Sequence, residues 1–214
     1  MRFNKLLFSF FIGVFTLSSY SQRQVKLGLS GGGNYSSLRF QDSSITEHDS
    51  EVGYLFGIAT NIQLKNELSL QIELNYERKV VSVFSPEFEI NGVKINSFRN
   101  YDLYDFMTLP VLLRYEVGEK SPFYINGGVF LGYLLSARER VNDGDLSEDL
   151  SEYFSDFDLG LSIGVGKIFL LDNSNELFVE LRNNLGLTNI DSDPNGQYQK
   201  TNSLSFILGW NLVL

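Results

Sequence analysis

The feature that most constrains the fold is an alternation of apolar and polar residues with a period of two. In segment 68–77 leucine, isoleucine and tyrosine fill the even positions, and serine, glutamine, glutamate and asparagine fill the odd positions. The alternation returns in 177–188, where Asn183 interrupts the apolar side, and in 203–214, where it continues to the last residue. Successive side chains of a β-strand point to opposite faces, so the pattern predicts strands with one apolar and one polar face.

The same count along the chain predicts eight strands, near 25–40, 51–64, 67–84, 100–117, 121–138, 154–170, 175–190 and 199–214. The connections 65–66, 118–120 and 171–174 are short, whereas 41–50, 85–99, 139–153 and 191–198 are long and polar. Short turns on one side and long loops on the other are typical of outer-membrane barrels. We therefore expect an all-β fold, an eight-stranded antiparallel up-and-down transmembrane β-barrel with both termini on the short-turn, periplasmic side.

The composition of the two faces favours a membrane barrel over a soluble barrel of the lipocalin kind, which turns its apolar face inward. The polar face is rich in glycine and would make a poor soluble core. Its glycines are Gly28, Gly32, Gly53, Gly57, Gly128, Gly132, Gly160, Gly164, Gly166, Gly186 and Gly209. The apolar face carries aromatic residues mostly toward strand ends, as in interfacial girdles: Tyr35, Tyr54, Tyr76, Tyr101, Tyr115, Tyr133 and Trp210.

The first residues predict a signal peptide. Arg2 and Lys5 precede an apolar run over 6–17, which is shorter than the roughly 20 residues of a membrane-spanning helix. Ser19 and Ser21 supply the small residues that a signal peptidase requires. We expect residues 1–21 to be removed and residues 22–214 to form the barrel domain; an N-terminal membrane anchor is the alternative.

Charge and cysteine content exclude several classes of partner and site. The formal net charge of −9 argues against nucleic acid as a partner, because phosphate binding requires clustered Lys and Arg. The sequence contains no cysteine, and therefore no disulfide, thiolate metal site or lipid-acceptor cysteine.

Three segments carry a family resemblance. Segment 106–115, Phe-Met-Thr-Leu-Pro-Val-Leu-Leu-Arg-Tyr, resembles the Pro-containing strand of the PorT-like outer-membrane β-barrel proteins of Bacteroidetes. The Gly-rich segments 29–35 and 124–133 resemble the first and fifth strands of that family, and the similarity covers residues 23–214. Leu214 departs from the aromatic residue that ends many outer-membrane barrels. The resemblance implies residence in the bacterial outer membrane, contact with its lipid, and the barrel-assembly machinery as a partner during biogenesis.

Charged residues on the predicted lumen face form the main candidate site. They are Lys26, Glu73, Glu77, Arg114, Glu116, Asp158, Glu180 and Arg182. A buried unpaired charge costs several kcal/mol, so these groups should be paired. We expect Glu73 to pair with Arg114 on the neighbouring strand, with Glu180 and Arg182 on the far wall. The cluster is interpreted as a structural plug, and a gated ion or proton path is the alternative. Pro110 lacks an N–H, so within its strand it should leave a missing donor in the ladder, at a bulge or strand end.

The sequence offers little for catalysis or metal binding. His48 is the only histidine and lies in loop 41–50 beside Asp49 and Ser50, without a second catalytic partner in view. The acidic segment 142–152 lacks the spacing of an EF-hand loop. We therefore expect a non-enzymatic barrel without cofactor or metal, with a polar plugged lumen and long loops that meet a protein partner or surface. The alternatives are a narrow pore for small solutes and a lipid-modifying enzyme that uses His48.

Overall fold

Strands account for the alternating segments of the chain. The computed structural model describes residues 24–40, 48–85, 87–90, 93–95, 97–118, 122–141, 144, 147, 149–193 and 198–214. Its strands are β1 (Val25–Phe40), β2 (His48–Gln63), β3 (Leu68–Ser85), β4 (Phe88–Ile90), β5 (Val93–Ile95), β6 (Phe98–Val117), β7 (Phe123–Val141), β8 (Phe157–Leu170), β9 (Asn175–Gly186) and β10 (Gln199–Val213). A 3-10 helix, η2 (Ser151–Tyr153), lies in the connection before β8. No helix among these residues is long and apolar enough to cross a membrane.

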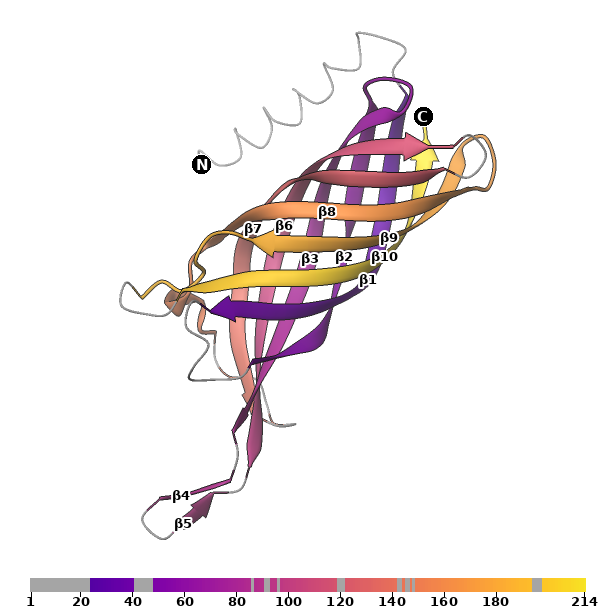
Figure 1. Cartoon of the computed structure of the whole chain (residues 1–214). Helices are drawn as coiled ribbons and strands as arrows, with labels where there is room; N and C mark the ends of the chain where they lie inside the picture. Colours follow the sequence, from indigo (N-terminus) through magenta and orange to yellow (C-terminus); the bar gives the residue numbers. More distant parts are fainter. Residues whose placement is uncertain are drawn as a thin grey trace.

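Eight of the described strands close into a barrel in which each strand is antiparallel to both of its neighbours (Figure 1). The order around the ring is β1-β10-β9-β8-β7-β6-β3-β2, and β10 pairs with β1 to close it. The closing register runs from Lys26 opposite Val213 to Phe40 opposite Gln199, so the seam is paired along almost the whole of both strands. The predicted all-β, eight-stranded antiparallel up-and-down barrel is confirmed.

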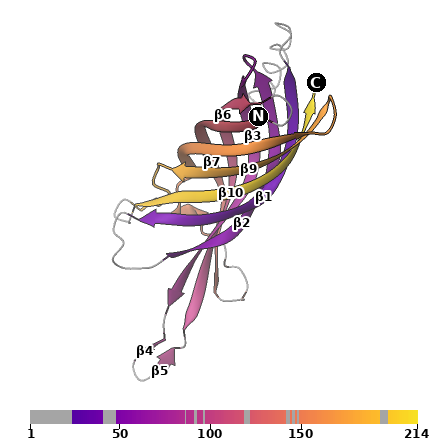
Figure 2. The ribbon, with the colours of Figure 1, turned by 45° about the vertical axis from the view of Figure 1, so that its right-hand side comes forward.

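The two ends of the barrel differ. The short-turn end holds the connections 64–67 and 171–174, the turn that begins at Gly118 in a left-handed conformation (φ 105°), and the last residue, Leu214. At the long-loop end β3 and β6 continue past the ring as an arm that ends in the β4–β5 hairpin (Figure 2). The connection 85–99, expected to be a loop, therefore contains a two-stranded sheet.

Strand ends depart from the predicted ones by a few residues. β2 begins at His48 rather than at 51, and β9 ends at Gly186 rather than at 190. The register shifts between Ser50 and Tyr54, and again where β6 passes Asp105, opposite β7. The extra residue of each bulge lies on β2 or β7 and moves the inward-facing set of side chains by one position, so simple parity fails beyond the bulge on these two strands.

Pro110 lies at neither a strand end nor a bulge, so that part of the prediction is wrong, whereas the expected gap in the ladder is present. It lies in the middle of β6, opposite Phe130 of β7. The missing N–H is accommodated on the side of β6 that faces β3. There the β3–β6 ladder is interrupted between the pairs Ile72–Val111 and Asn75–Thr108. Pairing to β7 alone thus keeps the residue in an interior strand.

The two faces of the wall have the composition that alternation predicts. On β8, Ile163 on the outside exposes 68% of its surface, whereas Ser162 on the inside exposes 3%. Glycine on the inner face lets side chains or backbone of the opposing strand approach closely: a Cβ atom on Gly32 would overlap the carbonyl of Phe206. So wide an exposed apolar band is untypical of a soluble monomer and fits a barrel wall that faces lipid.

Candidate functional site

The centre of the lumen is crossed by an ion-paired arginine. Arg182 of β9 donates two hydrogen bonds to Glu73 of β3, at 2.6 Å and 2.7 Å, and its Nε donates to Glu180 Oε1 at 2.5 Å. β3 and β9 lie four places apart in the ring of eight, so the bond joins opposite walls. All three side chains are almost completely buried. We call this group the central brace.

Neutral donors complete the coordination of the two carboxylates in the central brace. Asn75 Nδ2 donates to Glu73 Oε2 at 2.8 Å, and Gln71 also donates to Glu73. Tyr124 Oη donates to Glu180 Oε2 at 2.7 Å, and Asn126 Nδ2 donates to Glu180 Oε1 at 3.1 Å. A buried ion pair is tolerated when its remaining lone pairs are satisfied in this way.

The expected pair between Glu73 and Arg114 is not formed, because the register separates the two residues. Arg114 lies opposite Ser69, four residues along β3 from Glu73, which is roughly 13 Å at the usual strand rise. Its Nε instead lies 3.2 Å from Glu116 Oε1. Its guanidinium carbon lies 3.5 Å from the centroid of the Tyr124 ring, a cation–π contact.

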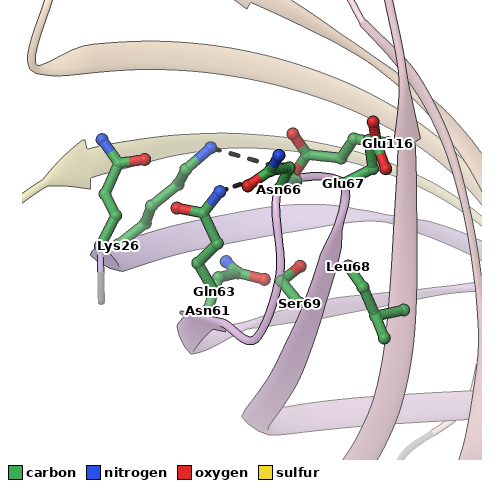
Figure 3. Close-up of a pocket in the computed structure, with 9 residues that line it drawn as sticks. Lys26, Asn61, Gln63, Asn66, Glu67, Leu68, Ser69 and Glu116 are labelled. Atoms are coloured by element: carbon green, nitrogen blue, oxygen red, sulfur yellow. Dashed lines mark hydrogen bonds and ion pairs between the residues drawn. The ribbon is translucent and has the colours of Figure 1, made fainter. Parts of the chain in front are cut away.

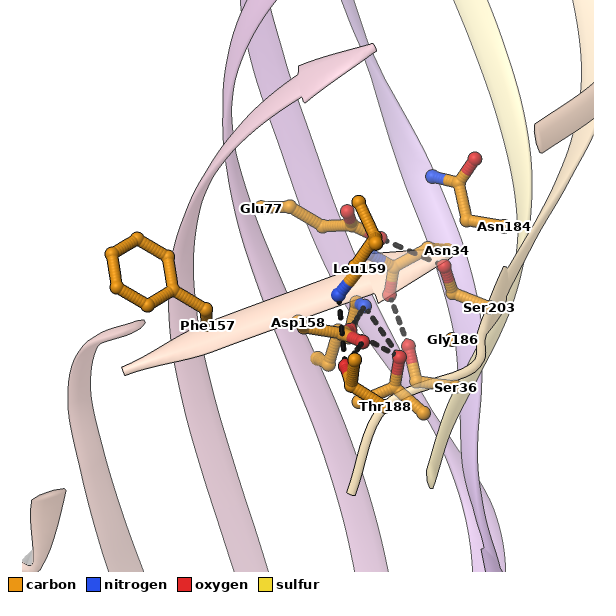
Figure 4. A network of polar contacts seen from close by, with 12 residues as sticks. Asn34, Ser36, Glu77, Phe157, Asp158, Leu159, Asn184, Gly186, Thr188 and Ser203 are labelled. Carbon is orange, nitrogen blue, oxygen red and sulfur yellow. Dashed lines mark hydrogen bonds and ion pairs between the residues drawn. The ribbon is translucent and has the colours of Figure 1, made fainter. Parts of the chain in front are cut away.

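A second polar network lies closer to the long loops, and Figure 4 shows it. Lys79 Nζ of β3 lies 3.3 Å from Asp158 Oδ2 of β8 and donates to Thr201 Oγ1 at 3.0 Å. Thr201 Oγ1 in turn donates to Asp158 Oδ2 at 2.5 Å. Sequence reasoning placed Asp158 in the lumen but missed Lys79, although it has the same parity as Glu73 on the same strand.

Glu77 lacks the ionic partner that was expected of it. Its carboxylate is 1% exposed and accepts hydrogen bonds from Ser203 Oγ at 2.8 Å and Asn34 Nδ2 at 3.4 Å (Figure 4). Both partners are neutral. Within the described residues, Glu77 therefore departs from the rule that every lumen charge is paired with an opposite charge.

A cluster of charges stands at the short-turn end. Lys26 Nζ donates to Glu176 Oε1 at 2.9 Å and lies 3.9 Å from Glu116 Oε1. A cleft of only about 30 Å³ opens beside Lys26 and is lined by polar side chains that include Asn61 and Gln63 (Figure 3). Sequence reasoning missed Glu176, which follows the same two-residue count as Glu180 and Arg182.

Two clusters of buried apolar side chains lie inside the barrel. One buried cluster contains Leu55, Tyr124, Ile168, Phe178 and Ile207. The other, at the long-loop end, contains Val81, Tyr104, Phe106, Leu134, Ala137 and Ile190, with Leu38 and Phe154 packed against it. Ile190 and Phe154 belong to the connections after β9 and before β8, which are joined by a bridge between Phe154 and Asp191. Described residues of these two connections thus pack together at the long-loop mouth of the barrel.

A cavity of about 300 Å³ remains at this mouth, between the inner wall of β6 and β7 and the segment that carries η2. Its apolar side includes Leu38, Tyr104 and Phe154, and its polar side includes Asp102 and Glu139. Asp102 and Glu139 lie directly opposite each other in the β6–β7 register. Neither carboxylate was among the candidate residues. The β7 bulge hides the inward position of Glu139 from a parity count, whereas Asp102 has the same parity as Arg114 on β6 and was missed.

Other predicted features lie partly outside the described residues. Residues 1–21, predicted as a signal peptide, fall there entirely, as do 41–47 and 194–197 of the predicted loops. His48 is the first residue of β2, and its side chain is not among those described. In the described part of the chain, no group of three or more His, Cys, Asp or Glu residues could hold a metal ion.

Comparison with known proteins gives one family and several structures. The model of the family described as "Outer membrane protein beta-barrel domain" matches residues 17–192. A major outer membrane protein from Thermus thermophilus is 13% identical, with 89% of this chain and 99% of that chain covered and a TM-score of 0.47. The N-terminal β-barrel domain of Pseudomonas aeruginosa OprF is 11% identical, with 89% and 97% covered and a TM-score of 0.45. OprG from Pseudomonas aeruginosa is 14% identical, with 90% and 95% covered and a TM-score of 0.43. No curated protein matches the chain.

Proposed function

The chain belongs to the outer membrane protein beta-barrel domain family and resides in the bacterial outer membrane, and from this premise we propose that it is a closed, non-enzymatic barrel that presents its long loops to a partner or surface. The observation that carries the proposal is the central brace, in which Arg182 joins Glu73 across the lumen at 2.6 Å and 2.7 Å. A pore would require an open path where this guanidinium lies.

The free energy of opening such a path supports closure. A permeating ion would have to displace a guanidinium that is hydrogen-bonded to two carboxylates, and removal of one partner from a buried pair costs about 3–5 kcal/mol. It would also have to pass the inward rings of Phe106 and Phe130, which are 1% and 0% exposed. The central brace closes the lumen by ion pairing, and the rings of Phe106 and Phe130 close it by apolar packing. Because the two forces are different, neither a change in salt nor the loss of one side chain opens the lumen.

The long-loop end supports a role in contact. In outer-membrane barrels the short turns face the periplasm and the long loops face the exterior. The arm of β3 and β6, with the β4–β5 hairpin at its tip, extends away from the ring and brings strand edges with it (Figure 1). We assign contact with a partner to the connections 41–50, 85–99, 139–153 and 191–198.

The finer assignments are part of the same proposal. Membership in the PorT-like group of Bacteroidetes is supported by segment 106–115, whose Pro110 lies within an interior strand. Export by removal of residues 1–21, and insertion by the barrel-assembly machinery, are supported by the family match and by the apolar outer face.

Single-channel recording in planar bilayers tests closure. Protein inserted into the bilayer, with insertion verified by protease protection, is expected to leave the current at the level of a protein-free membrane. Steady current steps in the wild-type protein that change in amplitude in the Arg182→Met variant would overturn the proposal and favour a narrow pore.

A separate assay tests the non-enzymatic part. Outer-membrane lipids incubated with the wild-type protein should give the same mass spectrum as lipids incubated without it. New lipid products that disappear in the His48→Ala variant would establish an enzyme.

A further inference from the structure

The cavity at the long-loop mouth has the size and the mixed lining of a small-molecule site. Its volume of about 300 Å³ lies at the lower end of the range for ligand pockets. Tyr104 and Phe154 form an edge-to-face pair on one side, with ring centroids 5.1 Å apart and an interplanar angle of 83°. The rings come from different elements, β6 and the loop before β8, so the loop completes the pocket. One side of the cavity therefore suits an apolar or aromatic body.

The other side of the cavity concentrates negative charge. Asp102 of β6 and Glu139 of β7 are directly opposite across the two strands, where like charges destabilise a sheet. No hydrogen bond or ion pair joins either carboxylate to a described cation. The neighbouring Arg140 guanidinium instead lies 5.0 Å from the Tyr101 ring centroid. Arg138 also lines the cavity, but among the described residues no ion pair joins it to either carboxylate. The fold thus holds two adjacent carboxylates in this cavity that no described cation pairs with.

A third acceptor lines the same cavity. Asn100, two residues before Asp102 on β6, also borders it, and its Oδ1 is buried without a hydrogen-bond partner among the described residues. A buried acceptor without a donor destabilises the fold, and a ligand that supplies the donor removes this cost. Three acceptor residues that line one cavity favour a ligand that carries several N–H donors and a positive charge.

We propose that this cavity binds a small organic cation, in which an ammonium or guanidinium group meets Asp102, Glu139 and Asn100 and an apolar body packs against Tyr104 and Phe154. A charged donor makes hydrogen bonds about twice as strong as a neutral one, and it relieves the repulsion between the two carboxylates. A bare metal ion fits less well, because the apolar side offers it no ligands. The inference goes beyond the proposed function, since binding at the mouth does not depend on whether the lumen conducts.

Calorimetric titration of the folded, full-length barrel in detergent micelles tests the site. The probes are 2-phenylethylammonium, benzylguanidinium, the neutral analogue 2-phenylethanol, and Ca²⁺. We expect saturable binding of at least one cationic probe, and binding of the neutral analogue at least tenfold weaker. The Asp102→Asn/Glu139→Gln double variant should weaken binding of the cationic probe at least tenfold.

The control is the Glu87→Gln/Glu89→Gln double variant in the arm, at and just before β4, which removes the same charge far from the cavity and should bind the probe as the wild type does. The difference between folded and heated electrophoretic mobility verifies that each variant remains a barrel. The proposal is overturned if neither cationic probe binds saturably, if the neutral analogue binds equally well, if Asp102→Asn/Glu139→Gln leaves affinity unchanged, or if only Ca²⁺ binds.

Discussion

Replacement of Arg182 by methionine removes the cation of the central brace while keeping a side chain of similar length. The guanidinium makes three charge-assisted hydrogen bonds, two to Glu73 and one to Glu180. At about 1.5–3 kcal/mol for each such bond, a simple sum would be about 4.5–9 kcal/mol. A carboxylate that has lost its cation can take up a proton, and water can enter the space, and both lower this figure. We therefore expect a loss of about 3–5 kcal/mol in the free energy of unfolding.

Urea unfolding in lipid vesicles measures this loss, with Trp210, the sole tryptophan, as the fluorescent reporter. Its indole lies on β10 and donates to Asn175 Oδ1 at 3.1 Å, so its emission follows the separation of β9 and β10. The Arg182→Met/Glu73→Gln/Glu180→Gln variant leaves no unpaired charge in the central brace and should recover most of the loss.

Lys94→Met is the matched control, because the Lys94–Glu87 pair is exposed, with 73% and 57% of the two side chains accessible. Such a pair contributes about 0–1 kcal/mol. If Arg182→Met lowers stability no more than Lys94→Met does, the central brace does not stabilise the barrel and the reasoning is refuted.

Two further predictions concern the wall and a loop. Gly32→Ala should lower the yield of folded barrel, because its Cβ would overlap the Phe206 carbonyl, whereas Gly31→Ala should fold normally, since its nearest contact is 3.6 Å away; equal yields by electrophoretic mobility would contradict this. The Ser151 hydroxyl and backbone N–H donate to Asp149 and hold the pKa of that carboxyl below its usual range, so its stabilisation of the loop is complete at neutral pH and lost as pH falls through the lowered pKa. The NMR shift of the Ser151 amide should therefore titrate with a midpoint below about 3.9, and a midpoint at or above that value would disprove it.

Much of the fold follows from alternation alone. The period of two determines which residues of a strand share a face, and the number and order of strands follow from counting it between turns. Parity therefore placed Glu73, Glu180 and Arg182 inside correctly, and the structure brings these three together. One further step of the count from Glu77 would have added Lys79, and two from Glu180 would have added Glu176.

Pairing inside the lumen did not follow, because it depends on register and on the diameter of the ring. Neighbouring strands suggested Glu73 with Arg114, but the register offsets these residues, and the partner of Glu73 comes from the opposite wall. The position of a bulge cannot be predicted from the alternation that precedes it. The sequence therefore did not show that Glu139 faces inward. Hairpin β4–β5 was missed for a related reason: its strands are only three residues long, too short for a period to be counted.

The position of the central brace has a consequence for the order of assembly. No two sequence-adjacent strands contain both of its ends, since β3 and β9 are separated by half the ring. The two strands of each hairpin can therefore form their backbone hydrogen bonds before Glu73 and Arg182 come into contact. The bond between them can be made only after the sheet has curled, so its formation marks completion of the cylinder rather than formation of any one strand pair. A crosslink between residues 73 and 182 would time that last step.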